Sequence, residues 1–305
     1  MKRFSSLLLI TILLGLAVVN FGYAEATRTV TDSLDRQVSL SGNPERVVTT
    51  IPSTTEIALD LGLDERLVGV SDLTKYLSYV PKLQAKADKT EKVGKFKLSM
   101  EKIAALNPDL IIVDGVAQKD VVSKLEDLDT TVYAVGGKDI DEVSEAILEL
   151  GYLTGTKDRA QEIVGQMAYK KFQLRGAVRE LEEKKTTLYT LSERMYTVGE
   201  NTLVGQVLEL AGLDNVFSDL SGYKPVSTEK IIQRNPELII ATEISGLSVE
   251  SLKNEVGLKG VKAIKEENIL LLSRDEDSMI NQRGTKIVDG AINLFERVYD
   301  KEVNL

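Results

Sequence analysis

Ser99–Val113 reads SMEKIAALNPDLIIV, and Ser227–Ala241 reads STEKIIQRNPELIIA. Nine of the fifteen aligned positions are identical. Each stretch predicts a short helix, a turn at Asn-Pro and a buried strand. A weaker echo, LDLGLD at Leu59–Asp64 and LELAGLD at Leu208–Asp214, supports the pair. The repeat predicts two similar lobes with a cleft between them, and small molecules usually bind in such clefts.

Strand and helix patterns alternate along the chain, which predicts an α/β fold with mostly parallel sheets. Strands are expected at Arg46–Ile51, Leu67–Val70, Leu110–Val113, Val132–Val135, Thr187–Leu191, Leu238–Ala241 and Ile269–Leu272. Helices are expected at Met100–Leu106, Lys119–Leu128, Asp141–Leu153, Thr202–Leu210, Thr228–Gln233 and Lys286–Tyr299. Another helix follows Pro52, where Ser53 and Glu56 have the spacing of a capping box.

A longer helical pattern separates the two repeats. Lys157–Lys185 carries apolar residues at the spacing of one helical stripe, and a continuous helix would be about 40 Å long. We therefore expect two Rossmann-like lobes, residues 25–156 and 186–305, joined by one long helix over residues 157–185.

The first 24 residues have the features of an export signal. Lys2 and Arg3 precede the apolar run Leu7–Val19, and Gly22–Ala24 supplies a small residue at the cleavage position. The apolar run is short for a membrane span, which needs roughly 20 residues. An uncleaved N-terminal anchor is the alternative. We expect cleavage and a protein that works in the periplasm or another extracytoplasmic space.

The composition excludes several kinds of chemistry. The chain has no cysteine, so disulfides, thiolate metal sites and a lipid-bearing N-terminal cysteine are ruled out, and we do not expect a lipoprotein. It has no histidine, so a Ser-His-Asp triad cannot form. The formal charge of −9 argues against nucleic acid as a partner. We expect a monomer without a resident metal or cofactor.

Two glutamates occupy equivalent places in the repeat. Ser99 and Ser227 are plausible helix N-caps, which puts Glu101 and Glu229 in first helical turns. An acidic group there is stabilised by the helix dipole, by roughly 0.3–1 kcal/mol, and that alone can explain both. The alternative is that each lobe presents one carboxylate to a basic socket on a partner.

Candidate ligand contacts come from loops that follow the predicted strands, since ligands of open α/β sheets bind at the carboxyl ends of strands. Arginine binds carboxylate groups with two hydrogen bonds, and aromatic rings pack on planar groups. Such a set suits an anionic, partly flat ligand, although each residue could equally be a surface residue with a local partner. The candidates are Ser53, Thr54, Tyr76, Phe96, Arg194, Tyr196, Arg274 and Arg283.

Three segments carry a resemblance to a known family. RVVTTIPSTTEIALDLGLDERLVGVSD from Arg46, KVGKFKLSMEKIAALNPDLIIVDG from Lys92 and the second repeat unit resemble the periplasmic binding proteins of ABC importers for iron-siderophores, haem and cobalamin. The resemblance implies two lobes, one long connecting helix and limited closure on ligand. It also implies that Glu101 and Glu229 dock on arginines of a membrane permease, one from each lobe.

The resemblance leaves the ligand open. The lack of histidine, and of a tyrosine just before Glu101, counts against haem, and the lack of tryptophan counts against a corrinoid. The arginines and tyrosines favour a ferric siderophore, with cobalamin second, and the chelator rather than the protein would hold the metal. A sensor would use the same cleft. A hydrolase that uses paired carboxylates is the alternative from another class, and it needs the two within roughly 5–10 Å.

Overall fold

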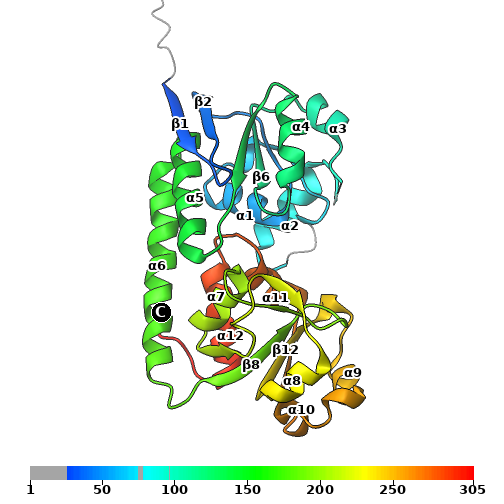
Figure 1. The fold of residues 1–305 in the computed structure, drawn as a ribbon. Helices are drawn as coiled ribbons and strands as arrows, with labels where there is room; N and C mark the ends of the chain where they lie inside the picture. Colours follow the sequence, from blue (N-terminus) through cyan, green and yellow to red (C-terminus); the bar gives the residue numbers. More distant parts are fainter. Residues whose placement is uncertain (1–25, 75–77, 96) are drawn as a thin grey trace, which may run out of the picture.

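The computed structural model describes residues 26–74, 78–95 and 97–305. Two α/β lobes lie one above the other, and a long helix runs along one side of both (Figure 1). The expected export signal, Tyr76 and Phe96 lie outside the described residues. Within the described ranges, no helix combines the length and apolar character that crossing a membrane requires.

The N-terminal lobe is built on a five-stranded sheet in which all neighbouring strands are parallel. Its strands, in spatial order, are β5 (Glu91–Lys92), β4 (Leu67–Val70), β3 (Val47–Thr49), β6 (Leu110–Asp114) and β7 (Thr131–Val135). Its helices are α1 (Pro52–Asp60), α2 (Pro81–Lys89), α3 (Met100–Ala105), α4 (Val122–Glu126) and α5 (Ile140–Thr154), with 3-10 turns η1 (Asp64–Arg66) and η3 (Lys119–Val121). An antiparallel hairpin, β1 (Thr27–Thr31) and β2 (Gln37–Ser41), precedes them.

The C-terminal lobe has a four-stranded parallel sheet and a separate antiparallel ribbon. The sheet order is β10 (Leu213–Asn215), β8 (Lys185–Thr190), β12 (Leu238–Thr242) and β13 (Ile269–Leu272), and the ribbon pairs β9 (Tyr196–Val198) with β11 (Tyr223–Pro225). Around them lie α7 (Leu203–Leu210), α8 (Thr228–Arg234), α9 (Val249–Asn254), α10 (Lys262–Lys265), α11 (Arg274–Asn281) and α12 (Ile287–Tyr299), with 3-10 turns η4 (Glu243–Ser245) and η5 (Val256–Leu258).

The repeated sequence forms the same unit in both lobes, as predicted. The Ser99 hydroxyl accepts the backbone N–H of Lys102 and begins α3, and the Ser227 hydroxyl caps α8 in the same way. Asn107 (φ 44°) and Asn235 (φ 45°) both turn the chain in the left-handed region, which asparagine tolerates better than most residues. The strands that follow, β6 and β12, are buried along their whole length, as central strands of parallel sheets are.

The connecting helix α6 (Lys157–Arg179) confirms that a long helix lies between the repeats, but it is shorter than predicted. It ends at Arg179 and not at Lys185, because Lys185 is the first residue of β8 and pairs with Leu213 of β10. Its buried side carries Ala160, Ile163, Met167 and Leu174.

The start of α1 differs from the expected capping box. The helix begins at Pro52, which fits the first helical position because its missing N–H needs no partner there. Thr54 Oγ1, not Ser53, contacts the N-cap residue: it accepts the backbone N–H of Ile51 at 3.4 Å and donates to the Ile51 carbonyl at 2.9 Å. Glu56 is buried and bonds elsewhere.

Candidate functional site

Glu101 and Glu229 lie in the first turns of α3 and α8, one in each lobe, and both are exposed. Figure 1 places α3 in the upper lobe and α8 in the lower lobe. The Ser227 hydroxyl holds the pKa of Glu229 below its usual value, so this carboxylate is charged at neutral pH. Each lobe therefore offers one negative group at an equivalent position on its surface.

Arg283 crosses from the C-terminal lobe to the N-terminal lobe. Its Nε donates to the carbonyl oxygen of Gly137 at 2.9 Å, and its guanidinium lies 3.4 Å from the carboxylate of Asp114. Asp114 is buried at the carboxyl end of β6, where its other oxygen accepts the backbone N–H groups of Val116 and Ala117. Arg283 is thus held at the junction of the lobes by groups at the ends of β6 and β7.

A second junction is built around Glu56 of α1. Its carboxylate accepts hydrogen bonds from the Tyr79 hydroxyl (2.8 Å), the Thr285 hydroxyl (2.9 Å) and the backbone N–H of Lys286 (3.0 Å). Burial raises the pKa of Glu56, and the three donors act in the opposite direction. Two of those donors belong to the segment between α11 and α12, so Glu56 ties the lobes together.

The rim of the C-terminal lobe carries tyrosines and arginines. Tyr196 (41% exposed) begins β9, and Tyr223 (46% exposed) begins its ribbon partner β11. Desolvation raises the pKa of the Tyr223 phenol, while the nearby Arg283 acts to lower it. Arg194 is exposed in the turn between β8 and β9, and Arg274 is exposed in the first turn of α11. Burial raises the pKa of Asp277 in the same helix, while the charge of Arg274 acts to lower it.

Ser53 and Thr54 lie at the carboxyl end of β3, and both are buried. The Thr54 hydroxyl is used inside α1, as described above. Ser53 Oγ has no hydrogen-bond partner among the described residues. A buried hydroxyl without a partner costs free energy, so Ser53 is the more suitable of the two to contact a ligand.

A cavity of about 620 Å³ lies where the two lobes meet beside α5 and α7. Its lining is polar: Lys138, Asp139 and Glu142 come from the N-terminal lobe, and Glu200 and Gln206 are among those from the C-terminal lobe. None of the predicted ligand residues lines it. The structure thus brings Arg283 to the lobe junction near Tyr223, whereas Arg194, Tyr196 and Arg274 stay on the exposed rim.

The sequence reasoning missed four residues that shape the junction: Glu56, Asp114, Tyr223 and Thr285. The sequence gives an indication for Asp114, because this residue ends a predicted buried strand and precedes a glycine, as residues at the ligand-binding edge of a parallel sheet often do. The sequence gives no such indication for Tyr223, because β11 reaches the junction only by pairing with β9. In the described part of the chain, no group of three or more acidic side chains is arranged to hold a metal ion.

These features define a two-lobed α/β protein whose lobes meet at a junction of polar and charged side chains. The family model described as "Periplasmic binding protein" matches residues 47–276, and the chain belongs to this family. It is therefore a substrate-binding protein of an ABC importer, with a small ligand and a membrane permease as partners, and it is not an enzyme.

Relatives of known sequence agree with the family. The chain is 26% identical over 279 residues to an uncharacterized ABC transporter substrate-binding lipoprotein, YvrC, of Bacillus subtilis, covering 89% of this chain and 85% of that protein. It is 27% identical to a cobalamin-binding protein of Halobacterium salinarum (73% of this chain, 60% of that one). A vitamin B12-binding protein of Yersinia pseudotuberculosis is 28% identical (65% and 69%).

Solved structures share the fold. A protein of Staphylococcus epidermidis, described as a possible iron-binding (periplasmic solute-binding) protein, superimposes with a TM-score of 0.73 at 28% identity, over 84% of this chain and 99% of that one. A periplasmic binding protein of Veillonella parvula superimposes with a TM-score of 0.76 at 23% identity, over 91% and 99%. The expected α/β architecture with two lobes is confirmed.

Proposed function

We propose that this protein captures a ferric siderophore between its lobes and delivers it to the permease through Glu101 and Glu229. The observation that carries the proposal is Arg283, which lies at the lobe junction near the Tyr223 phenol. A guanidinium can bind a negatively charged chelate by charge-assisted hydrogen bonds, and phenol rings can pack on its planar groups. Ser53 supplies a buried hydroxyl that has no hydrogen-bond partner among the described residues.

Arg283 also supports a mechanism of closure. In the described structure its guanidinium bonds the N-terminal lobe through Asp114 and Gly137. A ligand that bonds Arg283 would take over part of that interaction and change the balance between more open and more closed states. No covalent bond is made or broken in this cycle, and the chelator holds the metal.

Cobalamin is the second candidate, because two of the sequence relatives are named for binding it. A corrinoid would need aromatic or apolar surface for stacking, and the exposed Tyr196 and Tyr223 are the described residues best placed to give it. A direct binding measurement with each ligand distinguishes the two candidates, because the chelating groups of a ferric siderophore and of cobalamin differ in charge and shape.

Glu101 and Glu229 suit docking because each is exposed in a first helical turn and each belongs to a different lobe. A permease with two basic sockets would then recognise the two lobes together.

The first prediction concerns the double variant Glu101→Ala, Glu229→Ala. Its uptake should fall at least about tenfold in vesicles that hold the permease, since each lost charged contact is worth roughly 1 kcal/mol or more.

Ligand affinity of the double variant should match that of the unaltered protein. Glu250→Ala is the matched control, because Glu250 is an exposed glutamate in the first turn of α9. Loss of uptake in the control, or loss of ligand affinity in the double variant, would contradict the docking role.

A further inference from the structure

The outward face of α6 is unusual for a solvent-facing helix. Phe172 is 69% exposed and Tyr169 is 52% exposed, the former the most exposed large apolar side chain of the described residues. Gly165 and Gly176 lie on the same face, and a Cβ atom added to either would meet nothing within 4 Å. Phe172 therefore protrudes from this face. Gly165 and Gly176 leave two depressions in it, where another helix could approach closely.

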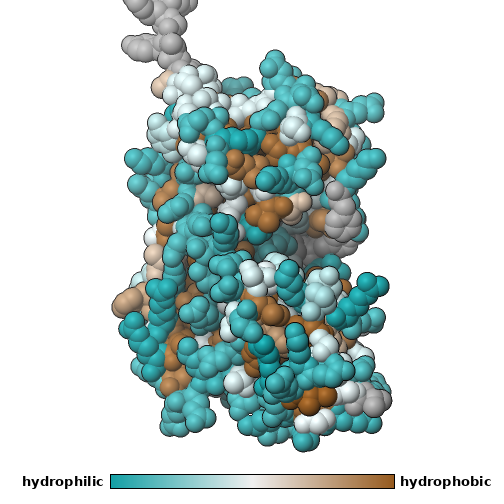
Figure 2. Space-filling view, viewed as in Figure 1, coloured by the Kyte–Doolittle hydropathy of each residue, from teal (hydrophilic) through white to brown (hydrophobic). Residues whose placement is uncertain are grey.

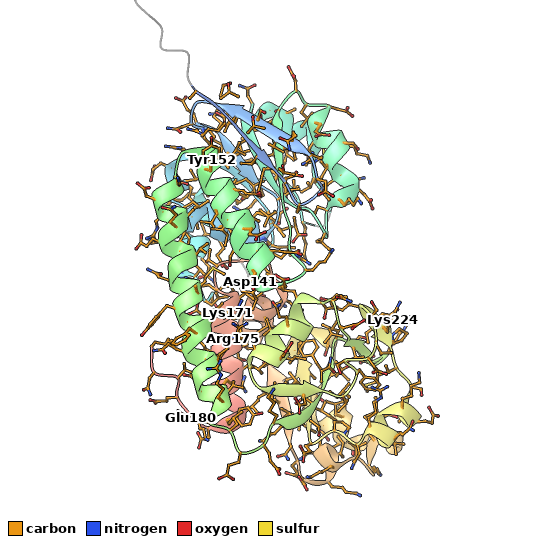
Figure 3. The ribbon with its side chains drawn as sticks, turned by 60° about the vertical axis from the view of Figure 1, so that its left-hand side comes forward. Asp141, Tyr152, Lys171, Arg175, Glu180 and Lys224 are labelled. Atoms are coloured by element: carbon orange, nitrogen blue, oxygen red, sulfur yellow. The ribbon has the colours of Figure 1, made fainter. Side chains whose placement is uncertain are left out.

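Charged residues mark the two ends of the same face. Asp158 lies in the first turn of α6, and Arg179 lies in its last turn. Both are exposed, and neither forms a side-chain hydrogen bond or ion pair with the residues that the structure describes. Figure 3 shows α6 at the front, with Arg175 and Glu180 labelled near its lower end.

We propose that two copies of this protein associate through their α6 helices, packed antiparallel about a two-fold axis between Ala168 and Tyr169. Phe172 and Gly165 are equally distant from that point along the helix, and so are Arg179 and Asp158. With about 3.6 residues per turn, all four lie on the face that holds Ala168 and Tyr169. A two-fold axis therefore sets Phe172 of each copy over Gly165 of the other, and Arg179 opposite Asp158.

The charge pattern selects the antiparallel orientation. A parallel pair would place Asp158 beside Asp158 and Arg179 beside Arg179, and like charges at an interface oppose association. The antiparallel pair replaces those repulsions with two attractive contacts related by the two-fold axis.

The interface leaves the transport surfaces accessible. In Figure 1, α6 lies on the left edge of the molecule, whereas α3 and α8, which carry Glu101 and Glu229, lie away from that edge. The surface in Figure 2 is largely hydrophilic, with a protruding apolar group at the left edge beside the waist. A dimer of this kind presents Glu101 and Glu229 of each copy independently, in place of the monomer expected from the sequence.

Cross-linking tests the geometry directly, because the chain has no cysteine of its own. In the Ala168→Cys variant, the new cysteine of each copy would lie near the two-fold axis and face the same cysteine of the other copy. The two Cα atoms would then be under about 7 Å apart, as a disulfide needs. Gly176→Cys is the matched control on the same face. In the antiparallel pair its two copies would be roughly 22 Å apart along the helix, at about 1.5 Å per residue.

Mild oxidation of the mature chain should convert Ala168→Cys, but not Gly176→Cys, into a disulfide-linked dimer. Equal cross-linking of both variants would indicate a parallel or non-specific contact and overturn the proposal. So would the absence of a dimer in either variant.

Charge exchange supplies an independent test by sedimentation equilibrium of chains without cysteine. Asp158→Arg alone and Arg179→Asp alone should each weaken self-association about tenfold or more, since each creates two like-charge contacts. An equimolar mixture of the two variants should recover the association, because every contact across the mixed dimer is then attractive. A monomeric unaltered protein at the highest attainable concentration, or a mixture no stronger than its components, would also overturn the proposal.

Discussion

At the scale of single residues, the junction depends on a buried carboxyl group. Glu56 is fully enclosed, and Gly284 makes its position possible, because a Cβ atom there would come within 2.5 Å of a Glu56 oxygen. Thr285 and Lys286, which follow that glycine, donate to the same carboxylate. Close backbone approach and hydrogen bonding therefore occur together at this point.

The raised pKa of Glu56 gives a pH dependence with a definite sign. Because the folded protein binds this proton more tightly than the unfolded chain, Glu56 contributes most to stability below pH 4.5, its ordinary pKa. That contribution decreases as the pH rises through the raised folded-state pKa.

Glu56→Gln should therefore make the free energy of unfolding fall less steeply as the pH rises above 4.5. It should also lower stability by about 1–3 kcal/mol, because one accepting oxygen is lost among buried donors. Urea unfolding at several pH values measures both effects. An unchanged pH slope would contradict the assignment.

Residue-scale prediction from the sequence succeeded where the signal was local. Ser99 and Ser227 cap their helices as expected because an N-cap bonds within its own first turn. Ser53 failed as a cap because Pro52 took the first helical position. Glu56 was unpredictable, since its partners Thr285 and Lys286 lie at the other end of the chain.

At the scale of elements, α5 and α6 pack together where a glycine leaves room. A Cβ atom on Gly151 of α5 would lie 2.3 Å from the Cβ atom of Ala160 in α6. Ala160 is fully buried, so neither helix can yield without moving its neighbours. This close approach is one of the contacts that hold α6 against the N-terminal lobe.

Gly151→Ala should destabilise the protein by about 1–3 kcal/mol, the usual cost of overpacking a buried contact. Gly176→Ala is the matched control in an exposed helical position with open space around it. It should stabilise the protein by about 0.5–1 kcal/mol, because alanine favours the helix. Thermal unfolding at low protein concentration compares the two, and equal shifts in Tm would refute the packing argument.

The elements themselves were largely predictable because strand and helix patterns are local. The buried strands β6 and β12 follow directly from their apolar runs. The end of α6 was placed too late because Val178 and Leu181 continue the apolar stripe, whereas the pairing of Lys185 with Leu213 depends on the sheet. The ribbon of β9 and β11 was missed for the same reason.

At the scale of the whole molecule, the lobes are joined by α6 and by side chains that cross between them. Arg283 bonds Asp114 and Gly137, and Ser78 bonds Asp275 through its backbone N–H at 3.0 Å. Glu56 adds its hydrogen bonds to Thr285 and the backbone of Lys286, so the separation of the lobes depends on several polar contacts together.

Asp114→Asn should shift the unbound protein toward a more open form. The substitution keeps an oxygen for the N–H groups of Val116 and Ala117 but removes the charge that faces Arg283. Loss of a charged hydrogen bond of about 1–3 kcal/mol should increase the radius of gyration in small-angle X-ray scattering, with little loss of stability. An unchanged scattering curve would contradict a role for this pair in closure.

The central claim is that Arg283 helps to bind a ferric siderophore between the lobes, and calorimetric titration of the mature chain tests it most directly. The account predicts saturable one-to-one binding of a ferric siderophore, weakened about tenfold to a hundredfold in Arg283→Ala, as loss of a charged hydrogen bond implies. Arg175→Ala, on exposed α6, should bind like the unaltered protein. Binding of cobalamin alone, or equal affinities of the Arg283→Ala variant and the unaltered protein, would contradict the account.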